Sequence, residues 1–411
     1  MLAFTILNCW LQRRLRITNP LMTTHPSLSA PMMNINLITP VEKMARNHPC
    51  WCGIGLKYKK CHLNRENQKP INHFEVEAKM LATMRKGYCS HPDQINDPCG
   101  SSIIKAHTVQ KKGGMAAIAE TGHVLTMKPR MKDITKTDGN PEPYRIGVND
   151  ASVFPGFCGD HDTRLFKPIE GKFLTFEKDT AFLFGYRAVA YEHFQRLAQI
   201  KSIEAQRLMD RGHPFSKQVV VQKIMSAFAV GAERGATEVK AWKAQFDARL
   251  LSGHRDDFRF VAVRFDEVLP FVAASAFHAE FAVDGKPLQR LGRQGNDDLE
   301  FATINVTTFG GQTIVVIGWI GSDTGPARDF ADSFLAVRDH LKADSLFRIL
   351  VIHTENLFLR ESWWNGLDPA LKAEFKTLVW AGTSKLERSR DQYKINTRLF
   401  SAAPIETVVA Y

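Results

Sequence analysis

Four side chains that favour soft metal ions lie within 13 residues near the start of the chain. They are Cys50, Cys52, Cys61 and His62, with the spacing C-x-C-x8-C-H. Zinc prefers four nitrogen or sulfur ligands in a tetrahedron, and three thiolates with one imidazole supply them. Gly53 and Gly55 allow the backbone to turn tightly enough for the ligands to converge. Because so short a segment has no hydrophobic core, we expect a zinc ion to hold it together. The alternative is four unrelated residues.

A second group of cysteines and histidines is spread over a longer stretch. Its members are Cys89, Cys99, Cys158 and His161. Cys158 and His161 form a C-x2-H pair, and the gap between Cys89 and Cys99 is longer than that of an ordinary zinc knuckle. We expect a second Cys3His zinc site of the treble-clef type, with His91 as a competing ligand. Scattered structural cysteines are the alternative.

The first group resembles the SEC-C motif, which is best known at the C-terminal tail of the bacterial preprotein translocase ATPase. The resemblance covers residues 47–63 and includes the ligand spacing, Pro49 and the two glycines. Trp51, Ile54 and Leu56 depart from the usual residues, but none of them is a ligand. In the translocase the motif is a contact surface for a chaperone and the ribosome. The resemblance therefore implies binding of a partner, and not catalysis.

The second region resembles the HNH (His-Me finger) endonucleases. A Cys pair precedes an apolar segment that ends in His107, and a Cys/His pair follows before an expected helix. The resemblance implies that His107 is the general base, that Asp162 is a second catalytic residue for metal binding or orientation, and that a Mg²⁺ ion stabilises the departing phosphate oxygen. Further candidates for metal binding or orientation are His123, Asn149 and Asp160. Ala106 departs from the family, which usually has an acidic residue before the histidine. A structural role for His107 is the alternative.

Charge is concentrated in the front of the chain. Of the formal charge of +11, residues 1–150 hold 21 Lys and Arg against 11 Asp and Glu. A basic half suggests a nucleic-acid partner, although a solvated lysine-rich surface gives the same count. A protein partner that docks on the SEC-C motif is also compatible with this charge distribution. No run of about 18 apolar residues is present, so we expect no membrane partner.

The seven cysteines indicate the compartment. Six of them fall between residues 50 and 158 beside histidines, which favours metal binding over disulfides. Cysteines that bind metal instead of forming disulfides indicate a cytoplasmic location. Residues 1–41 contain no Asp or Glu but include Arg13, Arg14 and Arg16. That segment is expected to be disordered, and is either a targeting sequence or an extension upstream of the real start.

The length of 411 residues suggests two or three domains. We expect an α+β protein in which small zinc-stabilised modules precede a C-terminal domain with long helices and an antiparallel sheet. The expected segments are 1–41 as above, 42–66 with the SEC-C motif, 67–171 with the treble-clef and HNH-like region, and 172–411 as the α+β domain of unassigned role. A flexible stretch is expected at 137–143.

Periodicity predicts individual elements in the last segment. The expected helices cover about 183–209, 217–251, 326–341 and 369–379. The expected strands cover 258–265, 276–283, 299–307, 312–320 and 347–353, with a hairpin at Gly310-Gly311. Two functions remain open: a zinc protein that binds nucleic acid or a protein partner, and an HNH-type endonuclease that uses Mg²⁺.

Overall fold

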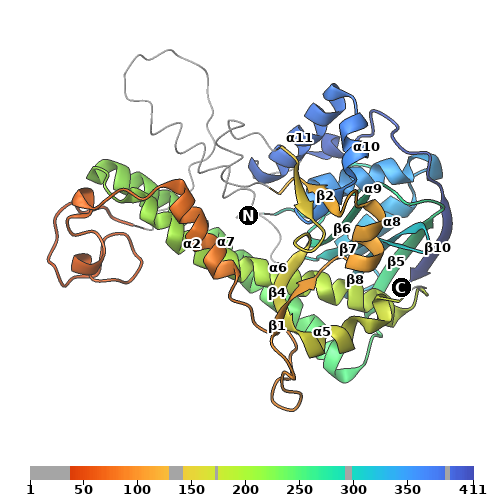
Figure 1. The fold of residues 1–411 in the computed structure, drawn as a ribbon, viewed down its shortest axis with the longest axis horizontal. Helices are drawn as coiled ribbons and strands as arrows, with labels where there is room; N and C mark the ends of the chain where they lie inside the picture. Colours follow the sequence, from red (N-terminus) through yellow and green to blue (C-terminus); the bar gives the residue numbers. More distant parts are fainter. Residues whose placement is uncertain (1–37, 129–141, 172–174, 292–298, 385–388) are drawn as a thin grey trace. The chain divides into compact units, whose positions relative to one another are not determined.

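The computed structural model (Figure 1) describes residues 38–128, 142–171, 175–291, 299–384 and 389–411. The expected disorder of residues 1–41 falls almost wholly outside this part of the chain, as does most of the expected flexible stretch 137–143. Within it, two units are distinguished. The first unit comprises residues 38–86 and 195–239, and the second comprises 87–194 and 240–411.

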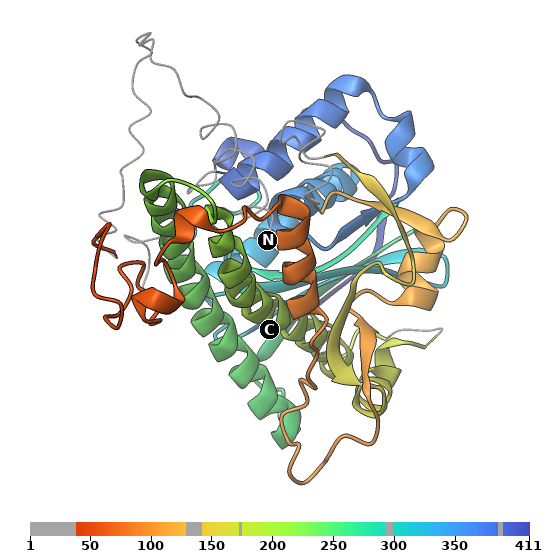
Figure 2. The same cartoon turned by 60° about the vertical axis from the view of Figure 1, so that its left-hand side comes forward.

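The first unit contains the SEC-C segment and a helical bundle. Its elements are the 3-10 helices η1 (Tyr58–Lys60), η2 (Arg65–Asn67) and η5 (Leu208–Asp210), helix α2 (His73–Met84), the end of α6 (Lys178–Arg207) and the start of α7 (Phe215–Ser252). Asn72 caps α2, because its side chain accepts a hydrogen bond of 2.8 Å from the backbone N–H of Glu75. Figure 2 shows α6 and α7 running side by side as a hairpin.

Apolar side chains hold this bundle together. Between α6 and α7 the buried residues are Ile203, Val221, Met225 and Ala232. Helix α2 adds a second small core, in which Val76 and Met80 pack against Ala205 of α6. The helices expected from periodicity at about 183–209 and 217–251 are confirmed.

The second unit is built on an eight-stranded antiparallel sheet with the strand order β10-β5-β8-β7-β6-β9-β2-β3. The strands are β2 (His123–Thr126), β3 (Tyr144–Gly147), β5 (Phe258–Phe265), β6 (Phe271–Phe277), β7 (Ala302–Phe309), β8 (Gln312–Ile320), β9 (Leu357–Leu359) and β10 (Pro404–Ala410). The expected hairpin at Gly310-Gly311 joins β7 to β8, and both glycines have positive φ, at 58° and 82°.

Helices cover both faces of this sheet (Figure 1). The start of α6 and the end of α7 pack on one face, where the rings of Phe182 and Phe246 lie 5.1 Å apart. Helices α8 (Pro326–Leu335) and α9 (Asp339–His353) cover the other face, where Phe347 lies 5.1 Å from Phe271 of β6. Further helices are α10 (Glu361–Gly366), α11 (Pro369–Ser384) and the 3-10 helix η6 (Arg390–Tyr393).

A second, two-stranded sheet positions the other candidate site. Strand β1 (Ile103–His107) pairs antiparallel with β4 (Val153–Cys158), and helix α5 (Gly159–Phe166) follows β4 directly. The short elements η3 (Lys111–Met115), α3 (Ala116–Ile118) and η4 (Lys167–Ile169) complete the unit. The chain is therefore an α+β protein with antiparallel sheets, as expected from the sequence.

Three local predictions were wrong. Residues 347–353 form the end of α9 and not a strand, because a short apolar run buried all round has no period that separates the two. The helix that begins at Pro326 ends at Leu335, and a new helix starts at Asp339. The strand expected at 276–283 is also wrong, because β6 begins earlier and ends at Phe277. Only an isolated bridge between Phe281 and Pro287 flanks the turn that follows.

Candidate metal centres

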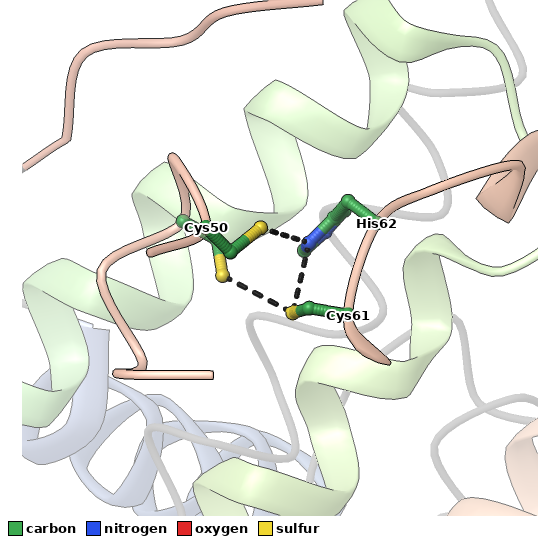
Figure 3. Close-up of side chains that lie close together, drawn as sticks. Cys50, Cys61 and His62 are labelled. Carbon is green, nitrogen blue, oxygen red and sulfur yellow. Dashed lines mark hydrogen bonds between the residues drawn. The ribbon is translucent and has the colours of Figure 1, made fainter. Parts of the chain in front are cut away.

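The four soft ligands of the first group meet in the first unit. His62 Nδ1 lies 3.2 Å from Cys50 Sγ and 3.1 Å from Cys61 Sγ, and Cys52 Sγ lies 3.5 Å from Cys61 Sγ. The three labelled side chains in Figure 3 point toward one another. All four residues are buried, and their ligand atoms lie within 4.8 Å of one another. In a zinc tetrahedron sulfur and nitrogen ligands are about 3.6 Å apart and two sulfurs about 3.8 Å apart. The donor set therefore fits one zinc ion.

The local backbone explains how so short a loop brings the ligands together. Cys50 N–H donates to the carbonyl of Leu56 at 2.8 Å, which closes the loop of residues 50–56 that carries the first two cysteines. Gly53 and Gly55 inside this loop have φ of 78° and 79°, a region that only glycine adopts readily. Helix η1 then turns the chain, because the N–H groups of Cys61 and the next residue both donate to the carbonyl of Tyr58.

A carboxylate from outside the motif holds the histidine ligand. His62 Nε2 donates to Asp210 Oδ2 at 2.8 Å, and Asp210 is fully buried in η5. Arg65 Nε and Gln222 Nε2 also donate to this carboxylate, each at 2.6 Å. Because Nε2 donates to Asp210, Nδ1 faces the three thiols and is the atom that can bind a metal once it has lost its own proton. Sequence reasoning missed Asp210, which lies 148 residues after His62.

Electrostatics around His62 link metal binding to protons. Burial lowers the pKa of this imidazole when no ion is bound, but the hydrogen bonds with Asp210 and Cys50 outweigh burial and raise it to about 10. A zinc ion must therefore displace a proton from Nδ1 at neutral pH.

The second group also gathers, in the second unit. His161 Nδ1 lies 3.2 Å from Cys158 Sγ, 3.3 Å from Cys89 Sγ and 3.9 Å from Cys99 Sγ, and all ligand atoms lie within 4.8 Å of one another. Cys158 is the N-cap of α5, and its sulfur accepts the backbone N–H of His161 at 3.4 Å. The start of this helix therefore places two of the four ligands on one side, and the set fits a second zinc ion.

The two clusters differ in how well water is excluded. Cys89, Cys158 and His161 are buried, but Cys99 is exposed. His161 Nε2 faces Asp97 Oδ2 at 3.4 Å, and this carboxylate is 37% exposed, whereas Asp210 in the first cluster is buried completely. The competing ligand His91 stacks on His161 with the ring centroids 4.0 Å apart, and it lies outside the set of three thiols. The second cluster is thus the more open of the two.

The residues expected for a nuclease do not form a metal-binding group. His107 ends β1, is half-buried, and donates from Nε2 to the carbonyl of Val148 at 3.2 Å. Asp162 lies in α5, and its Oδ1 atom is buried without a hydrogen-bond partner. Burial lowers the pKa of His107 and raises that of Asp162. Within the described ranges, neither belongs to a cluster of His, Cys, Asp or Glu able to hold a metal ion.

The three remaining candidates lie in separate places. His123 is in β2, and its Nδ1 atom is 2.8 Å from the carbonyl of Thr121. Asp160 accepts a hydrogen bond of 3.1 Å from Arg164 Nε. Asn149 is exposed between β3 and β4. The structure therefore does not bring these side chains together around His107.

Comparison with known protein families decides the nature of the first cluster. The family model of the SEC-C motif matches residues 46–64. This segment is a SEC-C motif. The match contains all four ligands of the first cluster, so the resemblance found in the sequence is confirmed. No curated protein and no solved structure matches the chain. Among the helices that the structure describes, none has the length and apolar character needed to span a membrane.

Proposed function

We propose that the chain is a zinc-dependent nucleic-acid-binding protein and that the unit containing the SEC-C motif is its binding surface. The observation that carries this proposal is the division of charge between the two units. Residues 38–86 and 195–239 hold 17 Lys and Arg against 8 Asp and Glu, whereas residues 87–194 and 240–411 hold 34 against 35. A strongly basic unit attached to a neutral one is typical of proteins that bind the negatively charged backbone of nucleic acids.

The cations nearest the first cluster support the same proposal. Five of them are exposed on the segment around the ligands: Lys43, Arg46, Lys57, Lys59 and Lys60. None of the five forms an ion pair with another residue that the structure describes. Unpaired cations on a metal-stiffened loop contact phosphates without first giving up internal partners, and with little loss of backbone entropy.

The test is the salt dependence of binding to a duplex oligonucleotide by the zinc-loaded full chain. Replacing Lys57, Lys59 and Lys60 by Gln removes up to three phosphate contacts, so the slope of log K against log[salt] should become less negative by up to about 2.7. A matched triple variant in the second unit, with Gln at the exposed positions of Lys167, Lys286 and Lys394, should leave the slope unchanged. Equal effects of the two variants, or a wild-type affinity that does not fall with salt, would contradict the proposal.

A metal-dependent endonuclease of the HNH type is the second candidate, and one observation favours it. Strand β1 pairs with β4 and helix α5 follows β4 directly beside the second cluster, an arrangement that supports a treble clef, and His107 ends β1. Its hydrogen bond to the Val148 carbonyl leaves the Nδ1 lone pair free to accept a proton, and its lowered pKa keeps it neutral at pH 7. The charges of Arg187 and Glu170 affect the pKa values of both His107 and Asp162.

Among the described residues, no metal-binding group contains His107 or Asp162, so the roles proposed here belong to these two side chains alone. Within this chain, His107 would take the proton of the attacking water, and Asp162 would orient that water. A plasmid-nicking assay with Mg²⁺ or Mn²⁺ compares wild type with His107→Ala, and His254→Ala, at an exposed position outside the candidate set, is the matched control. Loss of nicking in His107→Ala alone is expected. Equal nicking by wild type and His107→Ala rules this function out.

A further inference from the structure

A hollow of about 690 Å³ opens in the first unit against the SEC-C motif. Residues from three segments line it: the stretch before the first cysteine, the loop and 3-10 helices that carry the ligands, and the start of α7. Its volume lies in the range of sites that hold small ligands or peptide side chains. The phosphate-binding cations discussed above are largely absent from its lining, since Lys57, Lys59 and Lys60 do not contribute.

Aromatic rings form part of the wall. Trp51, Tyr58 and Phe215 all line the hollow, and the rings of Trp51 and Phe215 meet edge to face with centroids 5.4 Å apart. The hydroxyl of Tyr58 donates to the carbonyl of Glu42 at 3.0 Å, which fixes this ring against the segment before the first cysteine. Fixed aromatic faces attract cations through their quadrupole, and they do so most strongly when the cation is partly desolvated.

The charge of the lining has the opposite sign to that of the unit around it. Glu42 and Glu66 line the hollow with one ammonium group, that of Lys43. Burial and the carboxylates of Glu66 and Glu42 raise the pKa of Tyr58, which places both carboxylates within electrostatic reach of that ring. Two histidines also line the hollow, His62 and His213. Burial lowers the pKa of His213, so this side chain is neutral at pH 7. The hollow is thus locally acidic in a basic unit.

We propose that this hollow binds an arginine side chain presented by a partner protein. The planar guanidinium stacks on aromatic rings and forms forked hydrogen bonds to carboxylates, so it matches the half-buried ring of Phe215, which is backed by the buried rings of Trp51 and Tyr58, together with Glu42 and Glu66. A lysine side chain fits the same charges but stacks less well. A phosphate group is repelled by the two carboxylates, so this site is distinct from the nucleic-acid surface proposed above.

Saturation-transfer NMR on the zinc-loaded full chain tests this directly, with N-acetylarginine methylamide as the probe. The matched neutral probe is N-acetylcitrulline methylamide, which has nearly the same shape. One cation–π contact and two exposed ion pairs together predict about tenfold weaker binding of the citrulline probe. The double variant Glu42→Gln/Glu66→Gln should weaken the arginine probe by a similar factor, and Lys43→Gln should not weaken it.

Two controls keep the result interpretable. Zinc content is measured for every variant. The metal should be retained in the double variant, because both glutamates are exposed and neither belongs to a metal-binding cluster. Nucleic-acid affinity is measured in parallel, and it should not fall in the double variant. Equal binding of the two probes, undiminished arginine binding in the zinc-loaded double variant, or no arginine binding at all would each overturn the proposal.

Discussion

Replacing Asp210 by Asn probes the link between the SEC-C motif and the helices beside it. The carboxylate accepts hydrogen bonds from three donors, on His62, Arg65 and Gln222. An asparagine side chain offers one oxygen and one NH2 group, so at least one donor must face another donor. Arg65 is only 6% exposed, and it also loses the partner of its charge. The substitution therefore disturbs both the orientation of a metal ligand and a buried ion pair.

The size of the effect follows from these contacts. Removing the outer partner of a histidine ligand lowers metal affinity by about 10- to 100-fold, or about 1.4–2.8 kcal/mol. Breaking a buried ion pair by neutralising one member lowers the free energy of unfolding by about 3–5 kcal/mol. Structural zinc supplies about 10–16 kcal/mol of apparent binding free energy. Asp210→Asn should therefore still acquire zinc, but release it to a weaker chelator than wild type does.

The assay is equilibrium competition for zinc with a chromophoric chelator, followed at pH 7. Two steps are expected, and Asp210→Asn should shift only the step of the tighter site, toward about 10- to 100-fold lower chelator concentration. Asp150→Asn is the matched control, since Asp150 forms an exposed pair with Lys105 in the second unit. If circular dichroism shows a folded Asp210→Asn protein whose two steps coincide with those of wild type, the reasoning is refuted.

Three further predictions concern the clusters. The cluster that contains exposed Cys99 should lose zinc to a chelator, or to hydrogen peroxide, before the fully buried one does, and mass spectrometry should find oxidation first at Cys99; simultaneous loss would contradict this. Gly55→Ala meets no atom within 4 Å but has φ of 79°, so it should lower the free energy of unfolding by about 1–2 kcal/mol, whereas Gly231→Ala inside α7 should raise it by about 1 kcal/mol in the same denaturant titration. The folded pKa of His62 is about 10 against 6.5 for a free imidazole, so proton binding stabilises the zinc-free fold fully below pH 6.5, and this contribution is lost as the pH rises through 10. The apparent zinc affinity measured by calorimetry should therefore increase from pH 6 to 9, because fewer protons have to be displaced. A flat pH profile would count against the proton displacement.

The membership of both clusters could be predicted from the sequence, because soft side chains are few and the geometry of a zinc site restricts which of them can meet. The four ligands of the SEC-C motif lie within one short loop, so their spacing alone indicates the turn that joins them. Cys89 and Cys158 are far apart in the chain, and backbone hydrogen bonds from Tyr88 to Pro155 and from Ser90 to Gly156 bring the segment of Cys89 alongside β4. No pattern in the sequence predicted these hydrogen bonds.

Other features had no signal that a single sequence carries. Asp210 looks like any acidic residue near the end of a helix, and its partnership with His62 depends on how the α6–α7 hairpin packs beside the motif. The hollow likewise combines Glu42 and Phe215, which are distant in the chain. The run at 347–353 was misjudged because burial on every side removes the polar positions that mark a helical period. Tertiary packing, and not local pattern, determines these features.

Native mass spectrometry of the purified full chain tests the central claim most directly, namely that the two Cys3His clusters hold structural zinc. We predict a mass that corresponds to two zinc ions per chain, and one ion in Cys61→Ser, which removes a ligand of the SEC-C motif only. A folded wild-type chain with no bound metal, or an unchanged metal count in Cys61→Ser, would contradict the account.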